Sequence, residues 1–244
     1  MRLLTIDTSA VASAALLDLD LLDPVRPSTV VANFAVADTR SHAEVLAPGI
    51  SSLFTDAVSE GPQLAGVVVG TGPGPFTGLR SGIAMARALS FAWNVPLYAM
   101  MSLDALAQQV FDTAAKHNGR AVGPLATGDF IIATDARRKE VYWARYSANA
   151  QLLDGPHVGP AHELRDLPVF GAGAGLYREV LAANGCQVHE AFATAQPTAV
   201  ELGRAAARKI RAAGSLEQAG LLDSTPLYLR ESDAKVPGPR KRAL

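Results

Sequence analysis

One pattern of elements occurs twice in this chain, and it limits the fold more than any single motif does. Three strand-like apolar runs come first, and helices alternating with further strands follow them. In the first half we expect strands at 2–7, 12–19, 28–36, 64–70 and 95–100, and helices at 41–59, 77–93 and 102–115. Ser41 and Glu44 form a capping box that starts the first helix, and Pro48 should bend or weaken it.

The second half repeats this order after a glycine-rich segment at 116–128, which is the expected hinge. We expect strands at 128–135, 140–147, 150–153, 167–173 and 186–189, and helices near 161–166 and at 175–184 and 198–214. Two halves of βββαβαβα type predict a duplicated α/β fold. The predicted subdomains are 1–103 and 104–233, and the proline-containing basic tail at 234–244 should be disordered.

The composition narrows the class of protein. Lysine plus arginine number 22 and aspartate plus glutamate 23, so a net charge of −1 argues against a protein whose main role is coating nucleic acid. The single Cys186 excludes a disulfide framework within the chain and a cysteine-based metal cluster. The start becomes polar by Asp7, and no apolar run reaches membrane-spanning length. We therefore expect a cytoplasmic protein with no membrane segment.

The stretch GTGPGPFTGLR, from Gly70 to Arg80, follows a strand and opens a helix, where phosphate-binding loops usually lie. It lacks the Gly-Lys-Ser/Thr of a P-loop and the third glycine of the dinucleotide fingerprint. Pro73 and Pro75 have no N–H group to offer an anion. On composition, a rigid turn that fixes the entry of the next helix is the favoured interpretation.

Two short motifs are weak candidates for ligand sites. Asp7, Thr8 and Ser9 end the first strand as in the first phosphate loop of actin-like and sugar-kinase ATPases, although turn capping is the commoner role of such residues. The HAE motif at 42–44 has the His-x-Glu spacing of zinc deaminases, but one cysteine cannot complete that metal site. The sequence therefore predicts no metal site and no bound cofactor.

Three adjacent cations, Arg137, Arg138 and Lys139, stand at the tip of a predicted hairpin. Such a cluster can meet phosphate groups. A solvated turn is the favoured interpretation, and a contact with tRNA or a protein partner is the alternative.

The helix at 77–93 has apolar residues on nearly all sides. One side is a ridge of small residues at four-residue spacing: Gly78, Gly82, Ala86 and Ser90. The flanking residues Leu79, Met85, Leu89 and Trp93 should face the core. The opposite side carries a second stripe, made of Arg80, Ala84, Arg87, Ala88 and Phe91. A partner chain and the chain's own second subdomain are equally plausible covers for this stripe.

Taken in order, five segments carry a family resemblance: LLTIDTS, SHAEVLAP, VVVGTGPGPFTGLRSGIAMARALSFAWNVPLYAMMSLDALA, TDARRKEVYWARY and PLYLRESD. They resemble the TsaB (YeaZ) family, bacterial proteins needed to make threonylcarbamoyladenosine on tRNA. The resemblance is dense over residues 1–146 and sparse beyond. An insertion at 19–29 and the basic tail depart from the usual pattern.

The resemblance implies an actin-like, sugar-kinase (ASKHA, ribonuclease H-like) fold and a subunit that is not an enzyme. TsaB proteins are paralogues of the catalytic subunit TsaD, pair with it, and meet the ATPase TsaE in the assembly, so contact with tRNA is indirect. The two metal-binding histidines of TsaD fall here on Ser102 and Leu106, which cannot replace imidazole on a metal. The resemblance therefore implies a non-catalytic dimerisation subunit.

The resemblance also implies where the partner binds, through the first two helices, and the same surface would serve self-association. The expected interface residues are His42, Val45, Leu46, Arg80, Ala84, Arg87, Ala88 and Phe91. The alternative function is a nucleotide-binding actin-like ATPase or phosphotransferase that uses Asp7, Thr8 and Ser9. The sequence DARRK at 135–139 disfavours it, because such ATPases place a glycine-rich second phosphate loop there.

Overall fold

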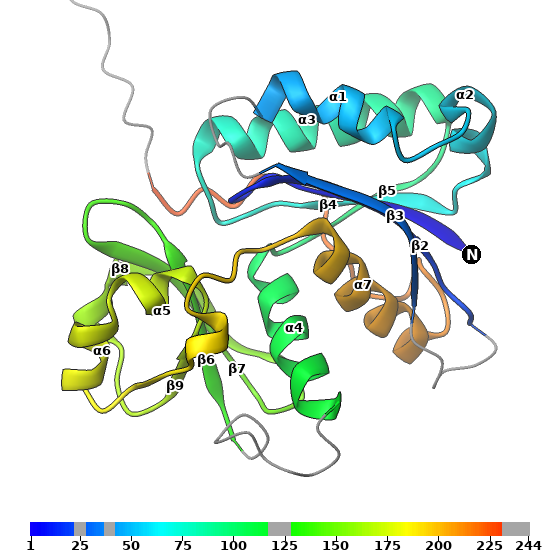
Figure 1. The fold of residues 1–244 in the computed structure, drawn as a ribbon. Coiled ribbons are helices and arrows are strands. Elements are labelled where there is room, and N and C mark those ends of the chain that lie inside the picture. The colour runs from blue at the N-terminus through cyan, green and yellow to red at the C-terminus, as the bar shows by residue number, and fades with distance from the viewer. Residues whose placement is uncertain (22–27, 37–41, 117–127, 231–244) are drawn as a thin grey trace, which may run out of the picture.

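The computed structural model describes residues 1–21, 28–36, 42–116 and 128–230, and the predicted tail at 234–244 lies outside them. Two five-stranded sheets carry the fold (Figure 1). The elements of the first half are β1 (Arg2–Asp7), β2 (Ala12–Asp18), β3 (Thr29–Val36), α1 (His42–Ser51), α2 (Ala57–Glu60), β4 (Gly66–Gly70), α3 (Phe76–Trp93), β5 (Leu97–Met100) and α4 (Leu103–Lys116). Those of the second half are β6 (Phe130–Asp135), β7 (Glu140–Tyr146), β8 (Leu152–Pro160), β9 (Pro168–Phe170), α5 (Ala172–Leu176), α6 (Arg178–Ala183), β10 (Gln187–Val188) and α7 (Ala199–Ala213).

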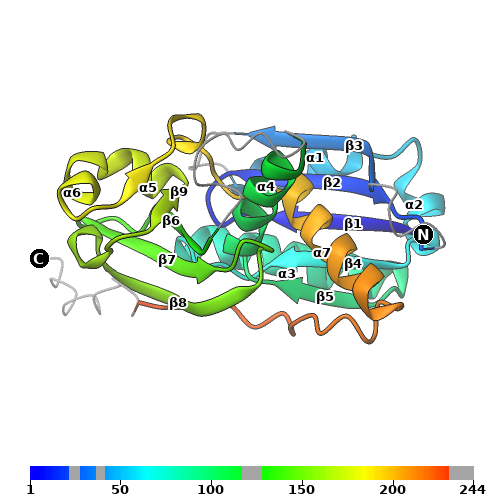
Figure 2. The same cartoon turned by 90° about the horizontal axis from the view of Figure 1, so that it is seen from below.

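The two sheets repeat one topology, which confirms the predicted duplication. The first sheet has the order β3-β2-β1-β4-β5, and the second, read from its β8 edge, has the equivalent order β8-β7-β6-β9-β10. In each sheet the first three strands are antiparallel neighbours, and the last two run parallel to the first. Figure 2 shows the two sheets side by side.

Helices cover both faces of the first sheet, which explains its continuous apolar strands. Helices α1 and α3 lie on one face and α7 on the other (Figure 1). Side chains alternate between the faces, because successive residues of a strand point to opposite sides. Val67 and Val69 join the core under α3, whereas Val68 packs with Leu202 and Ile210 of α7.

Some helices end earlier than the sequence predicted, where a capping residue or a turn interrupts the apolar pattern. The predicted helix at 41–59 is wrong in its second part, because α1 ends at Ser51 and a separate α2 starts from an N-cap at Asp56. Pro48 lies inside α1 without ending it. The predicted helix at 161–166 is only a 3₁₀ turn at Ala161–Glu163.

Strand β8 is longer than the predicted 150–153. It contains Pro156 and Pro160, which an edge strand tolerates because one side of its backbone has no strand to pair with. The predicted helix at 175–184 begins earlier and is divided into α5 and α6, which meet at Tyr177.

Helix α7 follows the second sheet in sequence but packs on the first one. It contributes Ala199, Leu202 and Ile210 to the same core as Leu3 and Leu17. The strands of the first sheet precede residue 103, the predicted boundary, and those of the second sheet follow it. Helix α7 also follows this boundary in sequence, but it packs with the first sheet.

Asp104 lies where α4, β7 and α7 meet. Its Oδ1 accepts a hydrogen bond from the Tyr146 hydroxyl at 2.8 Å, and its Oδ2 lies 3.9 Å from Lys209 Nζ. Burial raises the pKa of this carboxyl, against the opposing effects of Lys209, Tyr146 and Arg208. Burial also raises the pKa of Tyr146 well above its ordinary value.

The raised pKa of Asp104 predicts how stability changes with pH. Between the ordinary aspartate pKa and the higher folded value, the folded state binds more protons than the unfolded state, so unfolding free energy falls as pH rises. Asp104→Asn removes this titration. Urea unfolding from about pH 4 to about pH 7 should show the wild type losing stability relative to the variant as pH rises. A constant difference between the two proteins would contradict the prediction.

Candidate functional site: an exposed stripe on helix α3

The glycine-proline loop between β4 and α3 packs tightly against two other segments. A Cβ atom on Gly70 would lie 1.9 Å from Asp7 Oδ2, and one on Gly74 would lie 2.5 Å from the Ser9 carbonyl oxygen. Gly72 has a left-handed φ of 97°, and its N–H donates to Ser102 Oγ at 3.0 Å. The glycines therefore allow close packing that fixes where α3 begins.

Asp7, Thr8 and Ser9 are enclosed by this packing, with exposed fractions of 0%, 0% and 5%. Asp7 Oδ1 accepts hydrogen bonds from the Ser9 N–H and hydroxyl at 2.9 and 2.7 Å. The Thr8 hydroxyl donates to the Gly78 carbonyl at 2.7 Å. These contacts give no support to the nucleotide-binding alternative.

The inner side of α3 is as predicted. Gly78, Leu79, Gly82, Ile83 and Ala86 are buried, and Met85, Leu89 and Trp93 pack against the same core while partly exposed. The segment that approaches the glycine ridge is the end of β1, because a Cβ on Gly82 would lie 2.2 Å from Thr8 Oγ1.

The outer stripe of α3 is open to solvent. Arg80, Ala84, Arg87, Ala88 and Phe91 are all exposed, and Phe91 is 90% exposed. An aromatic side chain in water loses the hydrophobic free energy that burial would give it. The interpretation in which the chain's own second subdomain covers this stripe is therefore wrong.

The chain's last described residues run beside α3. We call residues 222–230 the C-terminal strap. Arg87 donates to the side-chain and backbone oxygens of Ser224, both at 2.9 Å, and Arg80 Nε donates to the Tyr228 hydroxyl at 3.1 Å. The centroid of the Tyr228 ring lies 4.5 Å from that of the Phe76 ring, and the Arg80 guanidinium lies over the Phe76 ring, 3.7 Å from its centroid. The strap thus holds both arginines of the stripe.

The strap was missed as a structural element from the sequence. PLYLRESD contributed to the family resemblance, but its alternation is too short to predict a strand or a helix. Several of its contacts are with residues far earlier in the chain, such as the hydrogen bond from Leu227 N–H to the Thr71 carbonyl at 2.9 Å. No local pattern reports such contacts.

The three interface residues expected on α1, which are His42, Val45 and Leu46, differ in how far the structure exposes them. Leu46 is 0% exposed and belongs to the core between α1, α3 and the first sheet, so its assignment to a partner surface is wrong. An apolar residue on an amphipathic helix can face either side, and here the core face includes position 46. Val45 is half-buried, and the side chain of His42 lies outside the described part.

Ser102 and Leu106, where the family resemblance places the two TsaD histidines, are both buried. Ser102 links to Gly72 in both directions, since its N–H donates to the Gly72 carbonyl at 2.7 Å. Leu106, a residue of α4, packs in the core with Phe130 and Ile132 of the second sheet. Within residues 1–21, 28–36, 42–116 and 128–230, no three histidine, cysteine, aspartate or glutamate side chains gather to hold a metal ion. In the same ranges, no helix combines the length and apolar character that crossing a membrane requires.

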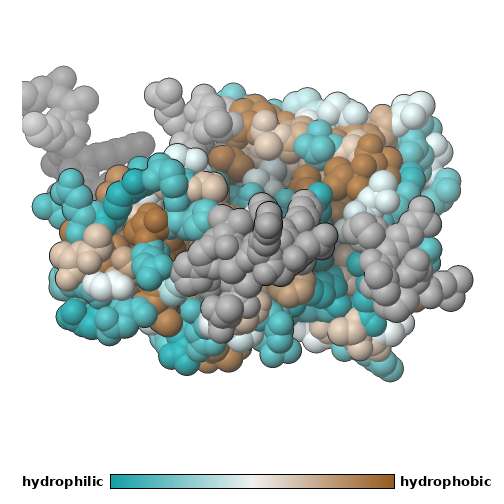
Figure 3. Space-filling view, turned by 60° about the horizontal axis from the view of Figure 1, so that its bottom comes forward, coloured by the Kyte–Doolittle hydropathy of each residue, from teal (hydrophilic) through white to brown (hydrophobic). Residues whose placement is uncertain are grey.

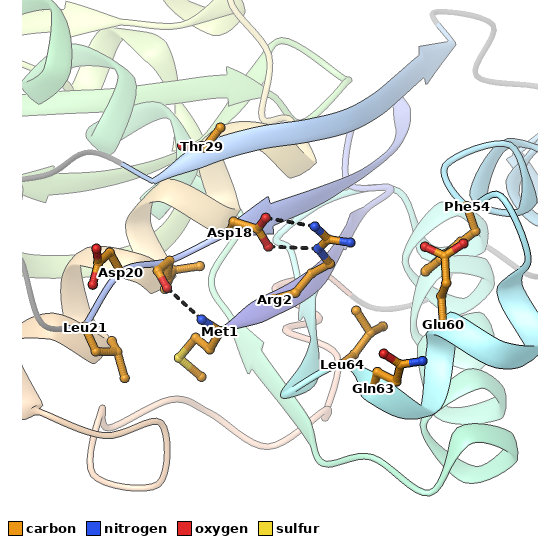
Figure 4. Close-up of a pocket in the computed structure, with 11 residues that line it drawn as sticks. Met1, Arg2, Asp18, Asp20, Leu21, Thr29, Phe54, Glu60, Gln63 and Leu64 are labelled. Carbon is orange, nitrogen blue, oxygen red and sulfur yellow. Dashed lines mark hydrogen bonds and ion pairs between the residues drawn. The ribbon is translucent and has the colours of Figure 1, made fainter.

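Two pockets of the described chain lie away from the stripe. Figure 4 shows a pocket of about 910 Å³ beside the N-terminus, where Arg2 and Asp18 pair through two hydrogen bonds of 2.8 Å. The guanidinium holds the pKa of the Asp18 carboxyl below its usual range. A second pocket of about 780 Å³ lies between the halves, where Asp104 and Lys209 meet apolar walls. In the first pocket, the Arg2 guanidinium and the Asp18 carboxylate satisfy each other.

Apolar area alone does not identify an interface on this chain. On the face seen in Figure 3, brown apolar areas also reach the surface among teal polar ones. The α3 stripe differs in having its aromatic side chain and two alanines along one ordered helix, with both flanking arginines held by the strap.

Comparisons with known proteins match this architecture. The family model described as TsaD: tRNA N6-adenosine threonylcarbamoyltransferase matches residues 29–236. The TsaB of Bacillus subtilis, named a tRNA threonylcarbamoyladenosine biosynthesis protein, is 31% identical over 154 residues, covering 63% of this chain and 58% of that protein. The chain belongs to the TsaB (YeaZ) family.

Two further comparisons cover more of the chain. An uncharacterized protein of Mycobacterium tuberculosis strain H37Rv is 35% identical over 206 residues, covering 84% of this chain and 83% of that protein. The solved structure of YeaZ from Pseudomonas aeruginosa has a TM-score of 0.68 and 25% identity, covering 93% of this chain and 99% of that one. The actin-like fold expected for a TsaB protein is thereby confirmed.

Proposed function

We propose that this chain is the non-catalytic dimerisation subunit of a tRNA threonylcarbamoyladenosine transferase, pairing with a TsaD-type catalytic subunit. The observation that carries the proposal is the exposed stripe of α3, with Phe91 beside Ala84 and Ala88. The name of the Bacillus subtilis relative supports a role in making this modified nucleoside. The matching family model carries the name of the transferase TsaD, and this relationship supports a TsaD-type partner.

The stripe has the chemistry of a helix-docking surface. Small residues let a second helix approach closely, and a central aromatic side chain supplies apolar area to bury. Arg80 and Arg87 flank this apolar strip, and their contacts with the strap limit their rotamers before a partner arrives. Fewer rotamers to lose on binding means a smaller entropic penalty. Alone, the chain would self-associate through the same stripe.

The buried roles of Ser102 and Leu106 support a subunit without its own metal centre. Both positions serve packing, and neither offers a metal-binding nitrogen. The partner would then supply the catalytic site, and a TsaE-type ATPase would join through the complex. The tRNA would meet the catalytic subunit first. An ATP titration of the isolated chain tests the alternative, an actin-like ATPase; saturable binding that Asp7→Ala abolishes would favour it.

Phe91→Ala tests the proposed surface. Because Phe91 is 90% exposed in the free chain, the fold should lose little stability. A buried aromatic anchor typically contributes about 2 kcal/mol to association, so Kd for the TsaD-type subunit should rise about thirtyfold. Isothermal titration calorimetry with the purified subunit measures this change.

Leu176→Ala is the matched control, since Leu176 is 59% exposed on α5 of the other half. Its affinity for the TsaD-type subunit should equal that of the wild type. Equal affinity of Phe91→Ala and Leu176→Ala would remove Phe91 from the interface. No detectable pairing of the wild-type chain would contradict the proposed function itself.

A further inference from the structure

The turn between β6 and β7 has an unusual backbone for its residues. Glu140 N–H donates to the Arg137 carbonyl at 3.0 Å, so residues 137–140 form a β-turn. Its two central residues, Arg138 and Lys139, have left-handed φ angles of 54° and 66°. A turn with positive φ at both central positions is type I′, the tight turn that matches the twist of a hairpin.

Arginine and lysine are poor choices for these positions. Type I′ turns favour Asn-Gly, because a Cβ atom disfavours the left-handed region. Arg137, just before them, is also left-handed, with φ of 63°. The pairing of β6 with β7 and the bond from Arg137 N–H to Asp135 Oδ1, at 2.8 Å, hold the turn in this shape. The conformation is imposed on these residues by their surroundings.

The turn is also a local concentration of positive charge. Arg137, Arg138 and Lys139 are exposed. The two neighbouring carboxylates have cationic partners: Asp135 lies 3.3 Å from Arg137 Nη1, and Glu140 pairs with Arg230 of the strap. Among the described residues these three cations are consecutive, in a chain whose overall net charge is −1.

We propose that Arg138 and Lys139 contact the phosphate backbone of RNA, and that these side chains are retained although they destabilise the turn. Residues held in a disfavoured conformation occur where function requires their side chains. Exposed cations on a narrow turn suit phosphate oxygens, which give affinity without reading sequence. The choice of RNA rests on the proposed function, in which tRNA is the substrate of the assembly.

The double variant Arg138→Asn/Lys139→Gly separates stability from binding. It installs the favoured turn residues, so Tm should rise by about 3–6 °C in thermal unfolding followed by circular dichroism. It also removes two cations. Fluorescence anisotropy with a labelled, unmodified tRNA transcript should show Kd raised about tenfold or more at about 0.1 M salt. The slope of log K against log salt should become shallower by about 1–2.

Two controls accompany this variant, and every binding measurement is made on the full chain with and without a TsaD-type subunit. Arg138→Lys/Lys139→Arg keeps the charge and the backbone strain, so both Tm and Kd for tRNA should match the wild type. Arg165→Asn/Arg178→Asn removes two exposed cations from elsewhere in the same half and should leave Kd for tRNA unchanged.

The outcomes separate this inference from the proposed function. If Arg138→Asn/Lys139→Gly raises Tm but binds tRNA as the wild type does, or if the wild type binds no tRNA in either state, the RNA contact is wrong. An unchanged or lower Tm would overturn the retained-strain part of the proposal. Size-exclusion chromatography of the same samples reports pairing, so loss of the RNA contact with pairing intact leaves the proposed function standing.

Discussion

Ala84→Arg is expected to abolish association with a TsaD-type subunit while leaving the fold intact. Ala84 is exposed at the middle of the α3 stripe, on the side opposite the buried glycine ridge. A long charged side chain there would push two helix axes apart and desolvate a guanidinium without a designed partner. Both effects act on the complex, and neither acts on the free chain.

Size-exclusion chromatography of the mixed subunits measures the loss, and circular dichroism checks the fold. The matched control is Ala182→Arg, the same change at an exposed position of α6. It should pair normally. Normal pairing of Ala84→Arg would locate the interface on another surface, and its unfolding would mean that a small residue at position 84 is needed for the fold of the free chain.

Gly70→Ala is expected to destabilise the fold by about 3 kcal/mol or more. The new Cβ would lie 1.9 Å from Asp7 Oδ2 and 2.7 Å from Ser102 Oγ. Asp7 is fully buried and Ser102 holds the loop that starts α3, so neither can move aside without disturbing its own contacts. Overpacking beside a buried carboxylate thus adds steric and electrostatic penalties.

Chemical unfolding in urea measures this loss against Gly128→Ala, because a Cβ on Gly128 would meet nothing within 4 Å. The control should unfold close to the wild-type midpoint. A Gly70→Ala protein with wild-type stability would show that the loop and β1 can separate at little cost, and the tight packing described above would then be wrong.

The order of strands and helices along the chain and the two faces of α3 could be predicted from the sequence, because both follow from periodicity within single elements. The duplicated topology was visible in the same way. Leu46 was assigned wrongly because α1 is apolar on more than one side, and only the position of α3 and the first sheet decides which side is buried. The place of α7 on the first sheet and the contacts of the strap depend on residues far apart in sequence, which no local pattern encodes.

The end of the chain ties its beginning to its middle. Leu222 exchanges two backbone hydrogen bonds with Ala99 at the edge of the first sheet, whereas Arg230 pairs with Glu140 at the start of β7 in the second. Any swing of one sheet away from the other must stretch or release this short tether. The C-terminal strap therefore restrains the angle between the two sheets and also orders Arg80 and Arg87 of α3. A protein cut near residue 222 would lose both the link between the sheets and the ordering of these arginines.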